Sequence, residues 1–286
     1  MTEFVTVFEV GPRDGLQNEA RLIPTEEKIA LVNALSDCGF RRIEVSSFVS
    51  PKWVPQMADA AQVFAGIVRR KGVSYAALTP NLVGFERALA AGADEVAVFG
   101  SASESFSRRN INCSVEESFA RFAPVCEAAR GAGVPVRGYV SCVTDCPYEG
   151  PVAPAAVARV AARLDRLGCF EISLGDTIGH GTPGTVSAML EAVTEAVPPG
   201  RLAGHFHDTK GRALENITVG LEAGLRVFDA AAGGLGGCPY APGARGNVAT
   251  ERVVAHLGEA GFATGIDREK LAAAADLARR MRKEAA

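Results

Sequence analysis

The stretch RLAGHFHDTKGRALENITVGLEAGLRVFDA (201–230) contains the unit from which most of the chain is built. Residues 202–207 predict a β-strand that ends in two histidines. Residues 211–223 predict a helix, because the helical pattern stops there at a glycine, Gly224. A second strand is predicted from residue 227 to residue 232. The stretch therefore predicts a strand, a helix and a further strand joined by short turns.

The same alternation of strand and helix recurs along the chain. Further strands are predicted at 4–10, 42–45, 73–78, 95–99, 135–140 and 170–174, and further helices at 25–38, 55–70, 82–91, 114–130, 154–167, 183–197, 248–259 and 267–282. The segments 100–113, 141–153 and 233–246 are predicted to be loops. Strands that alternate with helices indicate a parallel sheet with right-handed crossovers. Eight such units predict an α/β fold, a (β/α)8 TIM barrel, with an extra C-terminal helix.

The sequence contains no linker or low-complexity segment, so we expect a single catalytic domain over residues 1–286. The barrel would occupy about residues 4–260, and a C-terminal helical extension about residues 261–286. A doubly wound open sheet is the alternative fold, and it more often carries a G-x-G-x-x-G turn after the first strand. Residues 11–15, GPRDG, do not have that form, so the barrel is favoured.

The composition is that of an ordinary globular protein, and it argues against several classes of function. The 286 residues are 48% hydrophobic and 22% charged, with a formal net charge of −3. This balance gives no reason to expect nucleic acid or an anionic membrane surface as a partner. Among seven scattered cysteines, the close pair Cys142 and Cys146 lacks the second pair that would complete a zinc site. We therefore expect free thiols, a cytoplasmic location, no signal peptide and no membrane span.

Chemistry in a TIM barrel occurs at the carboxyl ends of the strands, where polar side chains of this chain collect. They are Arg13 and Asp14 after the first strand, Glu44 in the second, Tyr139 and Ser141 in the fifth, Asp176 after the sixth, His205 and His207 in the seventh, and Cys238 and Asn247 after the eighth. Residues two apart in a strand share a face, so His205 and His207 can bind one ion. Together with Asp14 and Asn247 they offer two nitrogens and two oxygens. Such a set suits Mg2+ or Mn2+ and does not exclude Zn2+.

Each of these residues also has a plainer interpretation. The pair Arg13–Asp14 is compatible with a surface turn, and Glu44 with a structural ion pair. Cys238 alone would be a small buried side chain in most proteins. Asp176 either caps the loop after its strand or reaches the region of Arg13 and the substrate. Trp53 is the one tryptophan of the chain, and we expect it to pack under the loop that follows the second strand.

Seven long segments resemble the 3-hydroxy-3-methylglutaryl-CoA (HMG-CoA) lyases, which belong to a superfamily of metal-dependent lyases and acyltransferases with an Arg-Asp motif on the first strand. They are EVGPRDGLQNE (9–19), IEVSSFVSPKWVPQMAD (43–59), LTPNLVGFE (78–86), RGYVSC (137–142), EISLGDTIG (171–179), HFHDT (205–209) and GGLGGCPYAPGARGN (233–247). The resemblance covers nearly the whole chain. It implies a TIM barrel that binds a divalent cation and cleaves (S)-HMG-CoA to acetyl-CoA and acetoacetate, as in leucine degradation and ketone-body formation. It also implies a homodimer.

The resemblance further implies which residues bind metal and substrate. The implied metal ligands are Asp14, His205, His207 and Asn247. We expect Arg13, Gln17 and Asp176 to contact the acyl-CoA substrate.

Chemical roles follow for the remaining groups. Arg13, held by Glu44, would stabilise the charge that develops on the thioester oxygen. Either His205 or Asp14 would accept the proton of the C3 hydroxyl, and the sequence does not choose between them. Cys238 would return a proton to the carbanion, and the glycines of its loop would let that loop close over the site.

A few positions depart from the family pattern near the predicted barrel mouth. They are Thr144, Asp145, His180, Lys210 and Arg212. None is an implied metal ligand, so they affect the expected substrate more than the expected chemistry. A related 3-hydroxy-3-alkylglutaryl-CoA is therefore an alternative substrate. A Claisen-type acyl-CoA synthase, a pyruvate-type aldolase and a non-catalytic barrel are further alternatives, and the Gly-Gly-Cys-Pro-Tyr segment at 236–240 favours the lyase.

Overall fold

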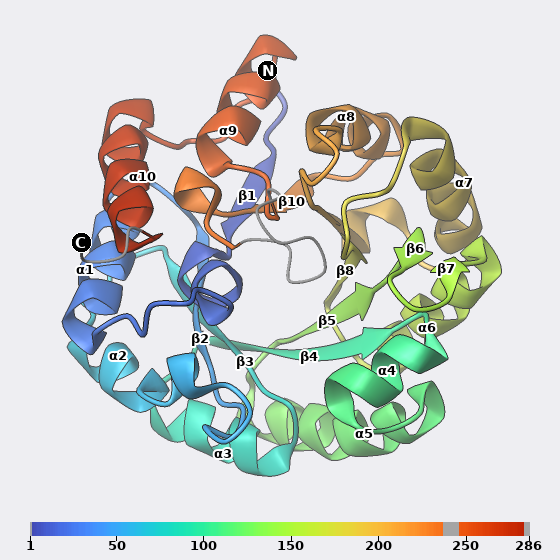
Figure 1. Ribbon diagram of the computed structural model, residues 1–286, viewed down its shortest axis with the longest axis horizontal. Helices are drawn as coiled ribbons and strands as arrows, with labels where there is room; N and C mark the ends of the chain where they lie inside the picture. The colour runs from blue at the N-terminus through green and yellow to red at the C-terminus, as the bar shows by residue number, and fades with distance from the viewer. Residues whose placement is uncertain (1, 237–245, 283–286) are drawn as a thin grey trace.

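The computed structural model describes residues 2–236 and 246–282. Eight parallel strands close into a barrel, and helices surround it (Figure 1). The strands follow one another around the barrel in the order β1, β2, β3, β4, β5, β8, β9, β10. Their bounds are Thr6–Glu9, Arg42–Ser47, Ser74–Leu78, Glu95–Ser101, Val136–Ser141, Glu171–Asp176, Leu202–Phe206 and Val227–Ala230. The predicted TIM barrel is confirmed.

Helices connect successive strands and cover the outside of the barrel (Figure 1). They are α1 Thr25–Ser36, α2 Ala60–Gly66, α3 Leu82–Ala90, α5 Val115–Ala132, α6 Pro154–Leu167, α7 Pro183–Thr194, α8 Ala213–Glu222 and α9 Thr250–Glu259. The predicted extra helix is α10, Arg268–Arg282, which packs against α1. The bounds of α6 were predictable because Pro154 opens the helix and Gly168, with φ of +94°, ends it.

Two segments that were predicted to be loops contain regular structure. The first, 100–113, contains α4, Glu104–Ile111, whose first turn is capped by the side chain of Ser103. The second, 141–153, contains a small hairpin of β6, Asp145–Cys146, and β7, Gly150–Pro151. Both predictions were wrong because short elements made mostly of polar or turn-forming residues carry little hydrophobic periodicity.

The predicted helix at 55–70 is shorter than expected. A 3-10 turn, η2 at Pro55–Met57, comes first, and α2 ends at Gly66. At Gly66 the helix approaches α1 so closely that an added Cβ would lie 2.3 Å from Ile29 Cδ1. A further short 3-10 turn, η3, spans Pro199–Arg201 before β9.

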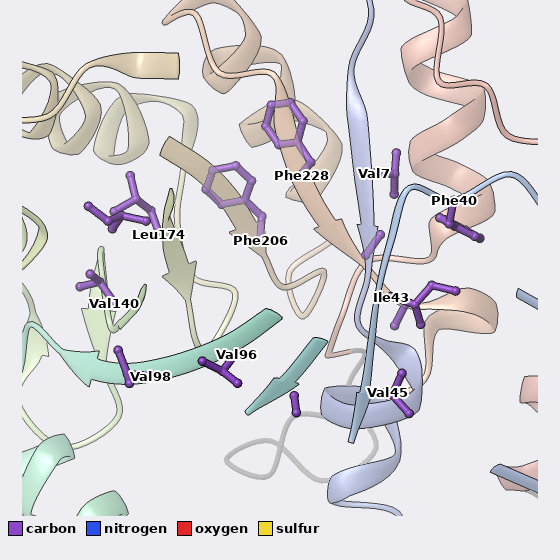
Figure 2. Packing of buried hydrophobic residues seen from close by; sticks show 14 of the residues in the cluster. Val7, Phe40, Ile43, Val45, Val96, Val98, Val140, Leu174, Phe206 and Phe228 are labelled. Atoms are coloured by element: carbon purple, nitrogen blue, oxygen red, sulfur yellow. The ribbon is translucent and has the colours of Figure 1, made fainter. Parts of the chain in front are cut away.

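Alternate residues of each strand face the helices, and these side chains form the main core. Figure 2 shows part of it, with Val7, Ile43, Val140, Leu174 and Phe228 among the labelled side chains. Each of these side chains is at most 2% exposed. Burying one such side chain stabilises the fold by about 1.5–3 kcal/mol, so this layer fixes the barrel wall.

The inward-facing residues near the amino ends and the middle of the strands form an ion network. Arg137 has no exposed surface, and its guanidinium donates to both oxygens of Asp229 at 2.9 and 2.7 Å. It also donates to Glu171 at 2.6 Å. Arg42 joins Glu171, at 2.8 Å, to Glu95, at 3.0 Å. We call these five residues the interior ion network, and it lies below the polar side chains of the barrel mouth.

The sequence predicted that Trp53 packs under the loop after β2. This prediction was wrong, because Trp53 is 81% exposed. Its neighbours in the sequence, Phe48 and Met57, are each 2% exposed and belong to the main core instead. Within residues 2–236 and 246–282, every helix is too short or too polar to cross a bilayer.

Candidate active site and metal centre

Arg13 and Asp14 lie in η1, Gly11–Gly15, a π-helical turn that follows β1. The carbonyl of Val10 accepts bonds from the N–H groups of Arg13, Asp14 and Gly15 at 3.2, 2.8 and 3.2 Å. Because three successive N–H groups donate to this one carbonyl, the backbone forms a tight turn at the carboxyl end of the barrel. Both functional side chains are therefore presented by fixed backbone.

Glu9 of β1 connects this turn to the segment that follows β10. Its buried carboxylate accepts from the N–H of Gly11 and the N–H of Ala232, each at 2.9 Å, and from the hydroxyl of Thr250 at 2.6 Å. Ala232 begins η4, Ala232–Gly234, and Thr250 begins α9. One carboxylate thus fixes η1 relative to both ends of the segment that carries Cys238.

The guanidinium of Arg13 is held between two carboxylates. Its Nε donates to Glu44 Oε2 and its Nη1 to Asp14 Oδ1, each at 2.6 Å. Burial alone would lower the pKa of Arg13, but the charges of Glu44 and Asp14 raise it above its ordinary value. Arg13 is therefore a permanent positive charge in one orientation.

The two histidines face each other, as the strand periodicity predicted. Their Nε2 atoms lie 3.2 Å apart. Two ligands at right angles on one ion, each at about 2.1 Å, would lie about 3 Å apart, so this spacing suits a shared cation. His207 follows β9 in an isolated antiparallel bridge with Asn247. Its Nδ1 is buried without a partner among the described residues.

Asp14 completes a candidate metal centre. One ligand atom from each of Asp14, His205 and His207 lies within 4.8 Å of the other two. Asp14 Oδ2 is 3.9 Å from His205 Nε2. Burial alone would raise the pKa of Asp14, but Arg13 and the two histidines outweigh burial and lower it to about 2. The centre therefore offers an ionised carboxylate and two imidazole nitrogens, a donor set that divalent cations accept.

Asn247 lies beside this centre. Its Nδ2 donates to Asp14 Oδ2 at 2.8 Å and to the carbonyl of Leu235 at 3.2 Å. Gly236, with φ of +90°, leaves room for it, since an added Cβ there would lie 2.8 Å from Asn247 Nδ2. The predicted ligand is therefore next to Asp14, and its part in binding metal stays a prediction.

Asp176 and Gln17 differ in what they contact. The carboxylate of Asp176 accepts from the Thr144 hydroxyl at 2.9 Å and from the N–H groups of His180 and Gly181 at 3.2 and 2.9 Å. These contacts are those of a loop cap, the plainer of its two predicted interpretations. Gln17, just after η1, has a buried Oε1 that lacks a hydrogen-bond partner among the residues described. Cys238 lies outside the described residues.

Residues 4–278 match the family model described as HMGL-like. The chain belongs to the HMGL-like family. A Pseudomonas aeruginosa protein named 3-hydroxy-3-isohexenylglutaryl-CoA/hydroxy-methylglutaryl-CoA lyase is 60% identical over 267 residues, which are 93% of this chain and 89% of that protein. A Mus musculus protein named 3-hydroxy-3-methylglutaryl-CoA lyase, cytoplasmic, is 58% identical over 271 residues, 95% of this chain and 79% of that protein.

A solved structure described as the HMG-CoA lyase from Brucella melitensis superposes on this HMGL-like chain with a TM-score of 0.98. It is 60% identical, and the match covers 99% of this chain and 100% of that one. The family resemblance seen in the sequence is confirmed.

The sequence did not predict one residue that contacts the site of this HMGL-like chain, Asp229 of β10. Its Oδ2 lies 3.1 Å from His205 Nδ1, and the same oxygen accepts from the Ser173 hydroxyl at 2.9 Å. Burial alone would raise the pKa of Asp229, but Arg137 lowers it below its ordinary value. An ionised Asp229 keeps the proton of His205 on Nδ1 and leaves Nε2 free to bind metal. The sequence signal that could have identified Asp229 is an acidic residue in the middle of a buried strand.

Proposed function

We propose that the chain is a lyase that cleaves (S)-3-hydroxy-3-methylglutaryl-CoA to acetyl-CoA and acetoacetate. The observation that carries the proposal is the contact between Arg13 and Asp14, which joins a fixed guanidinium to the three-residue metal centre. Retro-Claisen cleavage needs both an activated hydroxyl and a stabilised enolate, and this contact supports a site in which the two functions would act side by side. Relatives that are 58% and 60% identical carry this activity in their names.

Asp14, His205 and His207 would hold a divalent cation, with Asn247 as the fourth predicted ligand. A mixed nitrogen and oxygen set with a carboxylate suits Mg2+ or Mn2+, and Zn2+ is a weaker alternative. When bound, the cation would lower the pKa of the C3 hydroxyl of the substrate.

Cleavage requires a base, an electrophile and an acid. Of the two predicted bases, Asp14 is the one we propose, because a His205 that keeps its proton on Nδ1 and binds the cation through Nε2 has no free lone pair. The C3 hydroxyl loses its proton to Asp14, a carbonyl forms at C3, and the C2–C3 bond breaks. The electron pair of that bond moves onto C2 and the thioester oxygen. Arg13 already points in one direction, so it stabilises this oxygen without reorganising. Cys238 is our proposed donor of the proton that C2 then takes.

A lyase assay with metal removal tests this function. The purified protein with Mg2+ should release acetyl-CoA and acetoacetate in equal amounts, and activity should disappear with a chelator and return with Mn2+. The variant Cys238→Ala should lose most activity and keep its metal. Cleavage that persists after chelation, or in His207→Ala, would contradict the proposed role of the metal centre.

A larger 3-alkyl substituent is the second candidate for the substrate. The Pseudomonas aeruginosa relative is named for an isohexenyl substrate as well as for HMG-CoA. Thr144 and Asp145 are two of the positions at which this chain departs from the family pattern. The hydroxyl of Thr144 donates to Asp176, which caps the loop after β8, and Asp145 begins the β6–β7 hairpin. Parallel assays with HMG-CoA and the isohexenyl analogue decide between them. A kcat/KM at least about tenfold higher for HMG-CoA would remove the second candidate.

We also infer a homodimer and a cytoplasmic location, neither of which affects the chemistry above. Sedimentation velocity tests the first, and a single species with the mass of one chain would contradict it. Cell fractionation tests the second. The name of the Mus musculus relative supports it, because it designates a cytoplasmic form.

A further inference from the structure

The hydroxyl of Tyr139 is a buried donor without a hydrogen-bond partner among the residues that the structure describes. Tyr139 is 7% exposed and belongs to β5, two residues beyond Arg137 toward the carboxyl end of the barrel. Leaving such a group unpaired costs about 1–3 kcal/mol, so native proteins usually pair it. An unpaired hydroxyl at this place is explained if a bound molecule supplies the acceptor.

The ring of Tyr139 touches the groups that the proposed reaction uses. The guanidinium carbon of Arg13 lies 5.5 Å from the ring centroid, and the ring of His205 meets it edge-on with 6.4 Å between centroids. Arg137 of the interior ion network lies 4.7 Å from the same centroid. Leu78 and Ala97 pack against the ring and offer no polar side-chain atoms.

The surroundings also fix what the hydroxyl can do. A phenol hydroxyl is protonated at neutral pH, so the group is a donor. The carboxylate of Glu44 is not its acceptor, because Oε1 of Glu44 is itself buried without a partner among the described residues, while Oε2 is bonded to Arg13.

Part of the donor capacity of Arg13 is already occupied. Its Nε and one N–H of Nη1 donate to Glu44 and Asp14, which leaves three of its five N–H groups for the substrate, all in the plane of the guanidinium. A donor outside that plane would complete the enclosure of a developing oxyanion. We propose that the Tyr139 hydroxyl is a second donor to the thioester oxygen of the acyl-CoA substrate, beside Arg13. The inference rests on the proposed lyase function and adds a catalytic residue to it.

The variant Tyr139→Phe removes one oxygen and keeps the ring. Since the thioester oxygen gains charge during cleavage, kcat should fall about 10²-fold, as for loss of one oxyanion donor, while KM changes less than about threefold. The exchange of acetyl-CoA methyl protons with D2O passes through the same enolate, so it should slow by a similar factor. The matched control is Tyr75→Phe, which removes a buried hydroxyl bonded to Ser36 at 3.0 Å on the outer side of the barrel, and it should keep the wild-type kcat.

Each outcome of this experiment has a definite meaning. A raised KM with an unchanged kcat would overturn the inference, because the hydroxyl would then bind a group whose charge does not change. Equal kinetics of Tyr139→Phe and wild type would overturn it too, since water would then satisfy the hydroxyl. Wild-type protein without any HMG-CoA cleavage would overturn the proposed function and this inference with it.

A measurement on the wild-type protein covers the case in which Tyr139→Phe does not fold. The chain has four tyrosines, so 13C labelling at the ring carbon that bears the hydroxyl gives four signals. Acetyl-CoA should shift the signal of Tyr139 and leave that of Tyr75 in place. Single Tyr→Phe variants at positions 75, 148 and 240 assign three signals and leave that of Tyr139 as the fourth. No shift at saturating acetyl-CoA would overturn the inference.

Discussion

Two layers of polar side chains occupy the same barrel, and they differ in whether the protein satisfies them. In the interior ion network, Arg137 makes bidentate bonds to Asp229 and a third bond to Glu171. At the mouth, Glu44 Oε1, Tyr139 Oη and His207 Nδ1 are buried without partners within the described residues. Buried polar groups are normally paired, so the unpaired layer is where a ligand is expected. The interior ion network, which is fully paired, supports that layer from below.

The two layers meet at one residue. Asp229 accepts from Arg137 below and contacts His205 above. Its charge therefore serves both layers, because it balances a buried guanidinium and also orients a candidate metal ligand. The difference teaches that burial alone does not identify a functional residue, and that a buried unmet bond becomes informative where several of them gather at the barrel mouth. Substitutions in the interior ion network should therefore lower stability, whereas substitutions at the mouth should lower activity.

The largest expected effect is on stability, from the paired layer. Arg137→Met leaves the carboxylate of Asp229 buried without a guanidinium and leaves Glu171 with Arg42 alone, so the free energy of unfolding should fall by about 3–5 kcal/mol. Urea denaturation measures it. The control is Arg70→Met, which breaks an exposed pair with Asp37 and should cost at most about 1 kcal/mol. Equal losses in the two variants would show that the interior ion network does not support the barrel.

The next effect is on catalysis, from the barrel mouth. Arg13→Met should lower kcat about 10²–10³-fold, because it removes a charge fixed beside the developing oxyanion. Its affinity for Mn2+ should not weaken, since a positive charge next to Asp14 has been removed. Steady-state kinetics and Mn2+ titration provide the two measurements. A variant within about tenfold of the wild-type kcat would contradict the role given to Arg13.

A smaller effect is expected where the layers meet. Asp229→Asn keeps the shape of the side chain but removes the charge that orients His205, so metal affinity should fall about 10–100-fold. Calorimetric titration with Mn2+ measures it without depending on activity. Ser173→Ala is the matched control, because it removes another bond to the same carboxylate and leaves His205 untouched. If both variants bind Mn2+ alike, Asp229 does not orient the ligand.

The smallest effect concerns a third kind of buried carboxylate. Glu9 is satisfied only by neutral donors, and burial raises its pKa from 4.5 to about 7. The folded state therefore holds a proton that the unfolded state loses above about pH 4.5, so this part of the stability declines as pH rises from about 5 to 8. Relative to Glu9→Gln, the wild type should lose about 2 kcal/mol of unfolding free energy over that range. Parallel pH dependences would contradict the shifted pKa.

The sequence predicted the barrel because eight apolar strands alternate with helices whose ends are marked by glycine and proline. It also predicted that His205 and His207 share a face, since strand periodicity fixes that locally. Barrel topology and the family resemblance also predicted that Asp14 joins the two histidines, and the structure places its ligand atoms within reach of both. The contact of Asp229 with His205 was not predicted, because it joins side chains of two strands 24 positions apart. Whether Trp53 packs could not be predicted from local pattern, since its apolar neighbours Phe48 and Met57 are buried while Trp53 is exposed.

The central claim is that the mouth of the barrel binds a divalent cation through Asp14, His205 and His207. Mn2+ binding to the metal-free protein, followed by electron paramagnetic resonance, tests it most directly. The wild type should bind one Mn2+ per chain, and His207→Ala should lose more affinity than the about 10–100-fold expected for an outer partner such as Asp229. Equal Mn2+ affinity in wild type and His207→Ala would contradict the account.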